Sequence, residues 1–294
     1  MSWILFSILA SLIWAIVNII DKYVLTKWID NPIVPVIILG ILSLPASMIV
    51  YFIRGFSYLS YFNIFLAFIA GLFYVLMCLF YFKAVKTEEI SRIIPLFYLN
   101  AFFVIFLASF FLGEIFVPVK YIGIILLVSG AILISSRSSA KVNFGISFYL
   151  MILASFCSAI GQVITKYLLN FADYWTIFSY IRIGTFFILI PIFYLYFKDL
   201  ISTVKKHGKR VIIVVSFNEI LSLGAVILSI IAASIGYITL VNALSAIQPF
   251  FVLILTIIIS IFFPKILKEE IKKSAISQKL IAIVMMFAGA IWIS

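Results

Sequence analysis

The sequence predicts an all-α membrane protein with ten transmembrane helices, arranged as two inverted five-helix repeats. Of its 294 residues, 66% are hydrophobic and only 11% are charged, whereas soluble domains are about half apolar and about a quarter charged. The apolar runs are continuous and lack the alternation of membrane β-barrels. Because a chain inside a bilayer must satisfy its backbone hydrogen bonds internally, continuous apolar runs predict helices.

Ten runs approach the roughly 20 apolar residues that a helix needs to cross a bilayer. The first five are expected near residues 2–23, 32–53, 61–83, 90–112 and 117–135. The other five are expected near residues 144–169, 175–197, 211–234, 239–263 and 278–294. The first run has no basic segment or small-residue cleavage site of a signal peptide, so we expect it to be a span. Longer connections occur only at 198–210 and 264–279, and none has room for a soluble domain.

The two halves of the chain resemble each other. AIVNIIDKYVL at 15–25 aligns with AIGQVITKYLL at 159–169, with six of eleven positions identical, and GIILLVSGAILIS at 123–135 aligns with AIVMMFAGAIWIS at 282–294. Chance likeness of apolar segments is the alternative, but polar residues match as well, at Asn18 and Gln162 and at Lys22 and Lys166. Five helices per copy would make units 1–138 and 139–294 cross the membrane in opposite directions, as in many secondary transporters.

Four short motifs carry a resemblance to a known family. They are YFKAV at 81–85, IIPLF at 93–97, FLGE at 111–114 and YIGIILLVSGAILI at 121–134. In this order they resemble the ten-helix EamA-type members of the drug/metabolite transporter superfamily, and the resemblance extends over the whole chain. The second half keeps Pro249 and Gly289 but replaces the Gly-Glu end of its fourth helix with residues 263–265. The resemblance implies a transporter of the plasma membrane that is not an enzyme and uses no cofactor.

The positive charges are distributed unequally between the two sides of the predicted bundle. Connections after odd-numbered helices hold 17 of the 21 Lys and Arg residues, and the opposite side holds only Arg54, Lys120 and Lys166. The positive-inside rule makes the richer side cytoplasmic and places both termini outside, whereas the resemblance implies both termini inside. Because the bias runs through both halves, we prefer the charge count. It also explains the net charge of +11 without nucleic acid as a partner.

Arg182 and Glu219 are the charged residues that lie well inside predicted spans, seven residues after Trp175 and eight after Val211. Ionisable groups at this depth are costly and are functional candidates by default. On adjacent antiparallel helices both would lie near mid-depth, within reach of each other. We expect Arg182 to bind a carboxylate or phosphate, and Glu219 to hold Arg182 or to take a substrate amine or a proton. The alternative is a buried ion pair that only joins two helices.

Uncharged polar residues add to this candidate site. Asn18 and Gln162 hold equivalent places in the first and sixth helices, so a pseudo-twofold axis would bring them to a common central cavity. Hydrogen bonding between helices is the alternative. Asn100 and Tyr98 of the fourth helix and Trp14 complete the predicted substrate-binding set. Two further aromatic candidates for the cavity wall are Tyr74 and Tyr180.

The sequence also predicts roles for prolines, small residues and cysteines. Pro95 and Pro249 lie early in the fourth and ninth predicted helices, where a missing N–H group weakens the helix. They are candidate gating positions, or else static kinks or helix starts. Small residues at 123, 130, 282 and 289 are expected to allow close helix packing. Cys78 and Cys157 are expected to be small core residues, and no metal-binding or catalytic motif is present.

The sequence therefore predicts a secondary transporter, with a small metabolite such as an amino acid or another carboxylate as its substrate and export as its direction. One alternative is a flippase for a lipid-linked sugar phosphate, with a cavity open to lipid. Another is a non-transporting membrane subunit, whose centre would be collapsed around mutually satisfied polar residues. The expected partners are the solute and the lipid bilayer, and a homodimer is compatible with the sequence.

Overall fold

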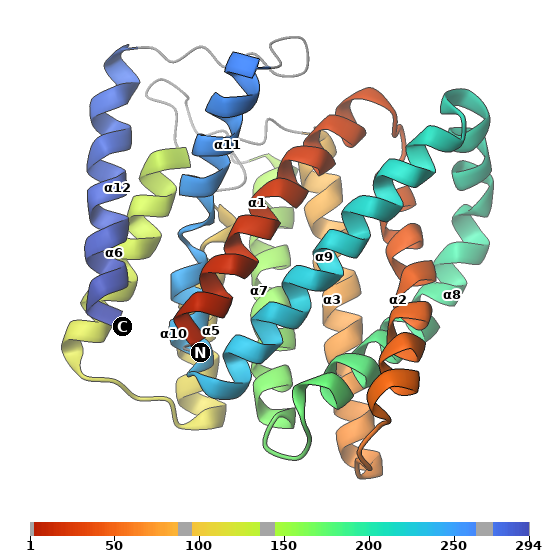
Figure 1. Cartoon of the computed structure of the whole chain (residues 1–294), viewed down its shortest axis with the longest axis horizontal. Helices are drawn as coiled ribbons and strands as arrows, with labels where there is room; N and C mark the ends of the chain where they lie inside the picture. The colour runs from red at the N-terminus through yellow and green to blue at the C-terminus, as the bar shows by residue number, and fades with distance from the viewer. Residues whose placement is uncertain (1–2, 88–95, 136–144, 263–272, 294) are drawn as a thin grey trace.

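The computed structural model describes residues 3–87, 96–135, 145–262 and 273–293, and every regular element within these ranges is a helix (Figure 1). The first half contains α1 (Trp3–Lys27), α2 (Ile33–Arg54), α3 (Tyr61–Thr87), α5 (Asn100–Leu112) and α6 (Pro118–Ser135). The second contains α7 (Ile146–Leu168), α8 (Tyr174–His207), α9 (Lys209–Ile235), α10 (Ile238–Ser245), α11 (Gln248–Phe262) and α12 (Lys273–Ile293). The predicted all-α class is confirmed for the described residues.

Seven helical stretches of the described chain are long and apolar enough to span a membrane. They are α1, α2, α3, α7, α8, α9 and the stretch Ile238–Ile259, which includes α10 and most of α11. Three shorter apolar helices lie at Asn100–Leu112, Pro118–Leu133 and Gln278–Ile293. Large apolar side chains such as Phe52, Tyr61 and Tyr194 are strongly exposed, as a surface that faces lipid requires. The chain is a multi-pass membrane protein.

The predicted connection at 198–210 is wrong, because most of it is helical. α8 continues past its apolar part to His207, with irregular backbone at Tyr196 (φ −111°, ψ 16°). Gly208, whose φ of 74° suits a glycine, then separates α8 from α9. Hydropathy detects where an apolar run ends, but a polar helix can continue into the headgroup region. Basic residues in the last turn of α8 also favour the negative end of the helix dipole.

The predicted ninth helix is interrupted. α10 ends at Ser245 and α11 begins at Gln248. In between, Ile247 N donates to Leu244 O at 3.0 Å, a tighter turn than that of an α-helix. Pro249 explains the break, because it lacks an N–H group and its ring excludes the carbonyl four residues earlier, which is that of Ser245. The predicted start of the fourth helix near residue 90, and Pro95 with it, lie outside the described residues.

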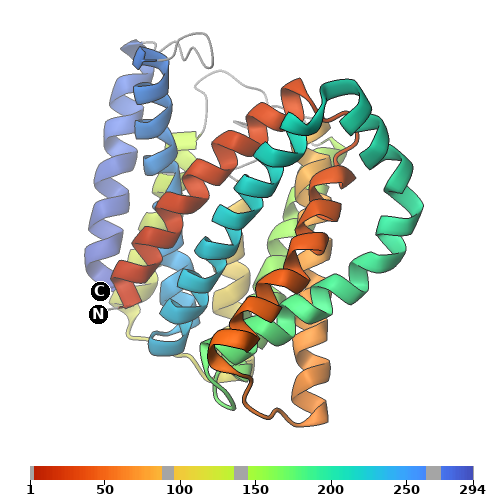
Figure 2. The same ribbon diagram turned by 45° about the vertical axis from the view of Figure 1, so that its right-hand side comes forward.

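Helices from the two halves pack against each other in pairs. α3 lies on α7, α1 on α9, α2 on α8 and α6 on α12, and Figures 1 and 2 show α1 beside α9 and α6 beside α12. Small residues allow the last contact, as predicted. A Cβ atom on Gly130 would lie 2.6 Å from Met286 Cγ, and one on Gly289 would lie 2.6 Å from Gly123 O. The two halves therefore form one interleaved bundle.

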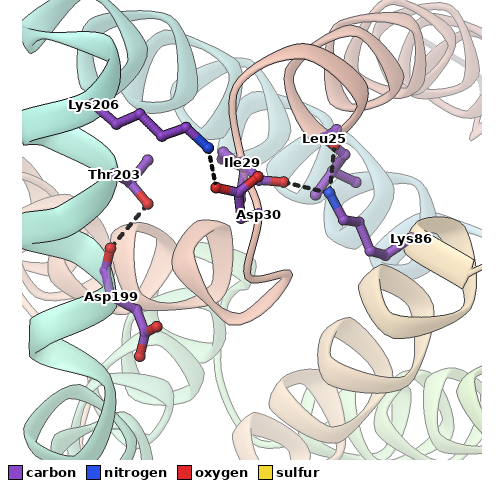
Figure 3. Close-up of polar contacts among 7 residues, drawn as sticks. All are labelled: Leu25, Ile29, Asp30, Lys86, Asp199, Thr203 and Lys206. Atoms are coloured by element: carbon purple, nitrogen blue, oxygen red, sulfur yellow. Dashed lines mark hydrogen bonds and ion pairs between the residues drawn. The ribbon is translucent and has the colours of Figure 1, made fainter.

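Both ends of the chain lie at the same end of this bundle, and the C-terminal ends of α1, α3 and α8 lie at the other (Figures 1 and 2). Figure 3 shows the polar contacts there. Lys86 Nζ donates to Leu25 O at 3.2 Å and to Ile29 O at 2.7 Å, which ties α3 to the end of α1. Lys206 forms an ion pair with Asp30 at 2.6 Å. Its hydrogen bond and charge hold the pKa of the Asp30 carboxyl below its usual range. Because this pair is exposed, it contributes little to stability.

Candidate substrate cavity

A cavity of about 250 Å³ lies among α1, α3, α7, α8, α9 and α10. Its wall contains all seven residues that the sequence predicts for substrate binding, namely Trp14, Asn18, Tyr98, Asn100, Gln162, Arg182 and Glu219. These residues come from five different parts of the chain, and the fold alone brings them together. Their role in binding remains a prediction.

Arg182 is the most unusual of these residues. It is only 1% exposed, and its guanidinium carbon lies 4.3 Å from the ring centre of Tyr74 and 5.5 Å from that of Phe178. Its Nε and Nη1 have no hydrogen-bond partner, and it forms no ion pair within the described part of the chain. A buried donor without a partner costs about 1–3 kcal/mol. The guanidinium is therefore available to an anionic group that enters the cavity.

Glu219 lies on the same cavity and is 4% exposed. None of the hydrogen bonds or ion pairs among the described residues involves its carboxylate, and no bond joins it to Arg182. The buried ion pair that was the alternative interpretation is thus not formed. The physical reason is that the Arg182 side chain stacks on Tyr74 of α3. The Arg182 guanidinium and the Glu219 carboxyl group therefore face one cavity without bonding to each other.

α1 and α7 present matching faces to the cavity. The lining positions of α1 are Trp14, Val17, Asn18 and Asp21, and those of α7 are Ser158, Gly161, Gln162 and Thr165. Each α7 position follows its α1 counterpart by 144 residues, the offset of the aligned segments. Steps of three, one and three residues keep all four side chains on one face of a helix.

Asp21 is the charged residue that sequence reasoning missed. Its Oδ1 accepts a hydrogen bond of 2.7 Å from Asn218 Nδ2. The predicted first span stops at residue 23, which placed Asp21 at its end, but α1 continues to Lys27. Its position three residues after Asn18, within the aligned segment, was the signal that could have revealed it.

A chain of amides crosses the cavity wall from α7 to α5. Asn242 donates to Gln162 Oε1, and Asn100 Nδ2 donates to Asn242 Oδ1 at 3.0 Å. Gln162 Nε2 also donates to Ser158 Oγ at 2.9 Å, and Asn18 Oδ1 accepts from Tyr81 at 3.3 Å. Hydrogen bonding between helices is thus present alongside exposure to the cavity. Asn242 was missed, although a polar residue in an apolar run is the signal that selected Asn100.

One aromatic expectation is corrected, and the cysteine expectation is confirmed. Tyr74 lines the cavity with Trp14, but Tyr180 does not, because it packs against Phe56 with ring centres 5.5 Å apart. Cys78 and Cys157 are buried core residues, as expected, and their free thiols also lie on the cavity wall. The reason is that both α3 and α7 turn a face toward the cavity.

Of the two candidate gating prolines, Pro249 lies among the described residues. Pro249 is the second residue of α11 and is buried. This position is a first helical turn, as the helix-start alternative expects, and it directly follows the break after α10. Pro95 lies outside the described residues. A gating role for either proline remains a prediction.

Two charged side chains cap helix ends where the chain passes from α9 to α10, beside the cavity. Glu114, the last residue of the FLGE motif, accepts from Ile238 N at 2.9 Å and Thr239 N at 3.0 Å. Lys166 Nζ donates to Ala233 O and to Gly236 O, both at 2.7 Å. Glu114 thus caps the first N–H groups of α10, and Lys166 caps the last carbonyls of α9. These contacts fix one end of the cavity.

Comparisons with known proteins agree with this architecture. A solved crystal structure of a protein aligns with a TM-score of 0.66, covering 99% of this chain and 95% of that chain at 13% identity. At this identity the likeness shows the fold alone. A search of the curated proteins finds no match. Residues 1–136 match the EamA-like transporter family. The motifs of the first half, which suggested this family, lie within the matched residues.

Proposed function

We propose that the protein is a ten-helix secondary transporter that binds a small zwitterionic metabolite, such as an amino acid, in this cavity and exports it across the plasma membrane by alternating access. The observation that carries this proposal is the unpaired state of Arg182 and Glu219 on one cavity wall. Buried charges without partners are strongly unfavourable. A substrate carboxylate would satisfy Arg182 by paired hydrogen bonds, and a substrate ammonium group would satisfy Glu219.

The size of the cavity favours this substrate class. Its volume of about 250 Å³ is below the roughly 300 Å³ at which pockets for drug-sized ligands begin. A small solute suits this space better than the sugar phosphate of a lipid-linked carrier. The centre also contains a cavity of about 250 Å³, and no ion pair joins Arg182 to Glu219 among the described residues. This supports transport over the non-transporting alternative.

Inverted repeats 1–138 and 139–294 would supply the alternating mechanism. Helix contacts support them, because the packing of α3 on α7 has its counterpart in that of α1 on α9, and that of α5 on α7 in that of α11 on α1. The matching faces of α1 and α7 also support the two repeats. The three shorter apolar helices add to the seven long spans to make ten crossings. An even number of crossings agrees with termini at one end of the bundle (Figure 1).

We also propose an orientation for the bundle in the membrane and a gating movement. The positive-inside rule assigns the lysine-rich end of the bundle to the cytoplasm and both termini to the outside. Bending at Pro95 and at the break before Pro249 would open and close the cavity.

The experiment that tests the proposal measures ligand binding and flux with purified protein. Wild type and Arg182→Met are screened in detergent against amino acids, carboxylates, sugar phosphates and organic cations for a rise in melting temperature. A ligand at about 100 times its dissociation constant stabilises the native state by about 2.7 kcal/mol. We expect amino acids to stabilise wild type but not the variant, and the active ligands to be exchanged by proteoliposomes. Stabilisation by sugar phosphates alone, or equal binding by the variant, would contradict the proposal.

A further inference from the structure

The cavity contains one more carboxylate than a simple amino acid requires. Asp21 lines it together with Arg182 and Glu219. Its hydrogen-bond partner within the described ranges is the neutral amide of Asn218, and no described Lys or Arg forms an ion pair with it. With all three groups ionised, the cavity wall carries two negative charges and one positive charge.

The two carboxylates belong to one side of the cavity. Asn218, which holds Asp21, directly precedes Glu219 in α9, and α1 packs along α9. Arg182 comes from α8 and stacks on Tyr74 of α3. The acidic and the basic groups are therefore presented by different helix pairs.

We propose that Asp21, with Glu219, forms a second subsite that binds an additional cationic group, so that the preferred substrate is a cationic amino acid. This inference rests on the proposed function of the cavity. A substrate with one carboxylate and two positively charged nitrogens has one group of opposite charge for each of the three charged groups on the cavity wall. The carboxylate binds Arg182, the α-ammonium group binds Glu219 and the side-chain cation binds Asp21. The aromatic rings of Trp14, Tyr81 and Phe82 also line the cavity, and ring faces attract organic cations.

The test compares L-lysine with L-norleucine, which has the same length but lacks the terminal amine. Dissociation constants are measured by calorimetry on the purified full-length protein in detergent at neutral pH. Asp21→Asn keeps an acceptor for Asn218 Nδ2 and removes the charge. The terminal ammonium group of lysine can form a charge-assisted hydrogen bond to Asp21, and norleucine has no group that can do so. We therefore expect wild type to bind lysine at least about tenfold more tightly than norleucine.

In Asp21→Asn the preference should disappear, because lysine binding weakens while norleucine binding stays unchanged. Asp21→Thr is the second neutral variant, since it copies Thr165 at the matching place in α7. Asp30→Asn is the matched control, because it removes the same charge at an exposed position and should keep the wild-type preference. A neutral variant is used only if it melts within a few degrees of wild type.

The outcomes separate the two proposals. If wild type binds both ligands equally, or if both neutral variants keep the preference for lysine, the Asp21 subsite is overturned while Arg182-dependent binding of norleucine still supports the proposed function. If Asp21→Asn changes only the pH dependence of norleucine binding, Asp21 is a proton site and the inference is wrong. If neither ligand binds to wild type, the proposed function fails together with the inference.

Discussion

Replacing Arg182 by methionine should stabilise the ligand-free protein while abolishing its binding of substrate. The guanidinium is 1% exposed, and its Nε and Nη1 have no partner among the residues that the structure describes. Methionine keeps an unbranched, apolar side chain of similar reach, so that the contacts of the aliphatic stem are largely retained. The substitution therefore removes mainly the charge and its unpaired donors.

The magnitude follows from two opposing contributions. Each unpaired buried donor costs roughly 1–3 kcal/mol, so removing two of them favours the variant. The stacking of the guanidinium on Tyr74 at 4.3 Å is lost, which costs about 0.5–2 kcal/mol. A net gain of roughly 1–4 kcal/mol in the free energy of unfolding is expected. Such an exchange of stability for binding is common at functional sites.

The assay is thermal unfolding of the purified protein in detergent, with and without the amino acid that gives wild type its largest shift. At roughly 2–4 °C for each kcal/mol, the ligand-free variant should melt at least about 2 °C above wild type. Ligand should raise the melting temperature of wild type only. Arg54→Met is the matched control, because Arg54 is exposed at the end of α2. It should change stability by no more than about 0.5 kcal/mol.

A fall in the melting temperature of Arg182→Met would refute this reasoning. Breaking a buried ion pair typically costs about 3–5 kcal/mol. Such a loss would mean that the guanidinium has a structural partner, and that its exposure to the cavity is not a binding feature.

Three further predictions concern other parts of the cavity and its supports. A bound substrate should slow the alkylation of Cys78 and Cys157, because both line the cavity. At about ten times its dissociation constant, the substrate should lower the alkylation rate by about tenfold. Intact-protein mass spectrometry measures this rate, and an unchanged rate would place the ligand elsewhere. Glu114→Gln should lower the melting temperature, because an amide offers a single acceptor to the N–H groups of Ile238 and Thr239 and leaves one buried donor unpaired, at a cost of about 1–3 kcal/mol. Asp173→Ala should cost about 1 kcal/mol at neutral pH, because its carboxylate caps α8 through Trp175 N and Thr176 N.

The effect of Asp173 should also depend on pH. Burial opposes ionisation of its carboxyl, but hydrogen bonds from Thr176, Trp175 and Ser57 outweigh burial and hold its pKa below the usual range. A carboxyl whose pKa is lowered by folding stabilises the protein above its unfolded pKa of about 3.9, and this contribution is lost as the pH falls through the folded value. The difference in melting temperature between wild type and Asp173→Ala should therefore shrink in acid. A difference that stays constant down to the folded pKa would argue against the cap.

Much of the candidate site was predictable because polar residues inside membrane spans avoid lipid. Arg182, Glu219, Asn18 and Gln162 were selected on this principle, and all four lie on one cavity. The principle fails near the ends of a span, where hydropathy does not show whether a residue faces water or protein. Asp21 was missed for this reason, since the last turn of α1 is built from residues that the predicted span excluded.

The sequence alone determined the class of the protein, because only helices can satisfy the backbone of long apolar runs in a bilayer. It also pointed to a family, through motifs that lie within the match of residues 1–136 to the EamA-like transporter family. Only the tertiary structure decided which polar groups pair. Arg182 packs on the ring of Tyr74 and does not form an ion pair with Glu219. Tyr74 lies more than 100 residues earlier in the chain. Such choices depend on contacts between helices distant in sequence, and no local pattern of residues specifies them.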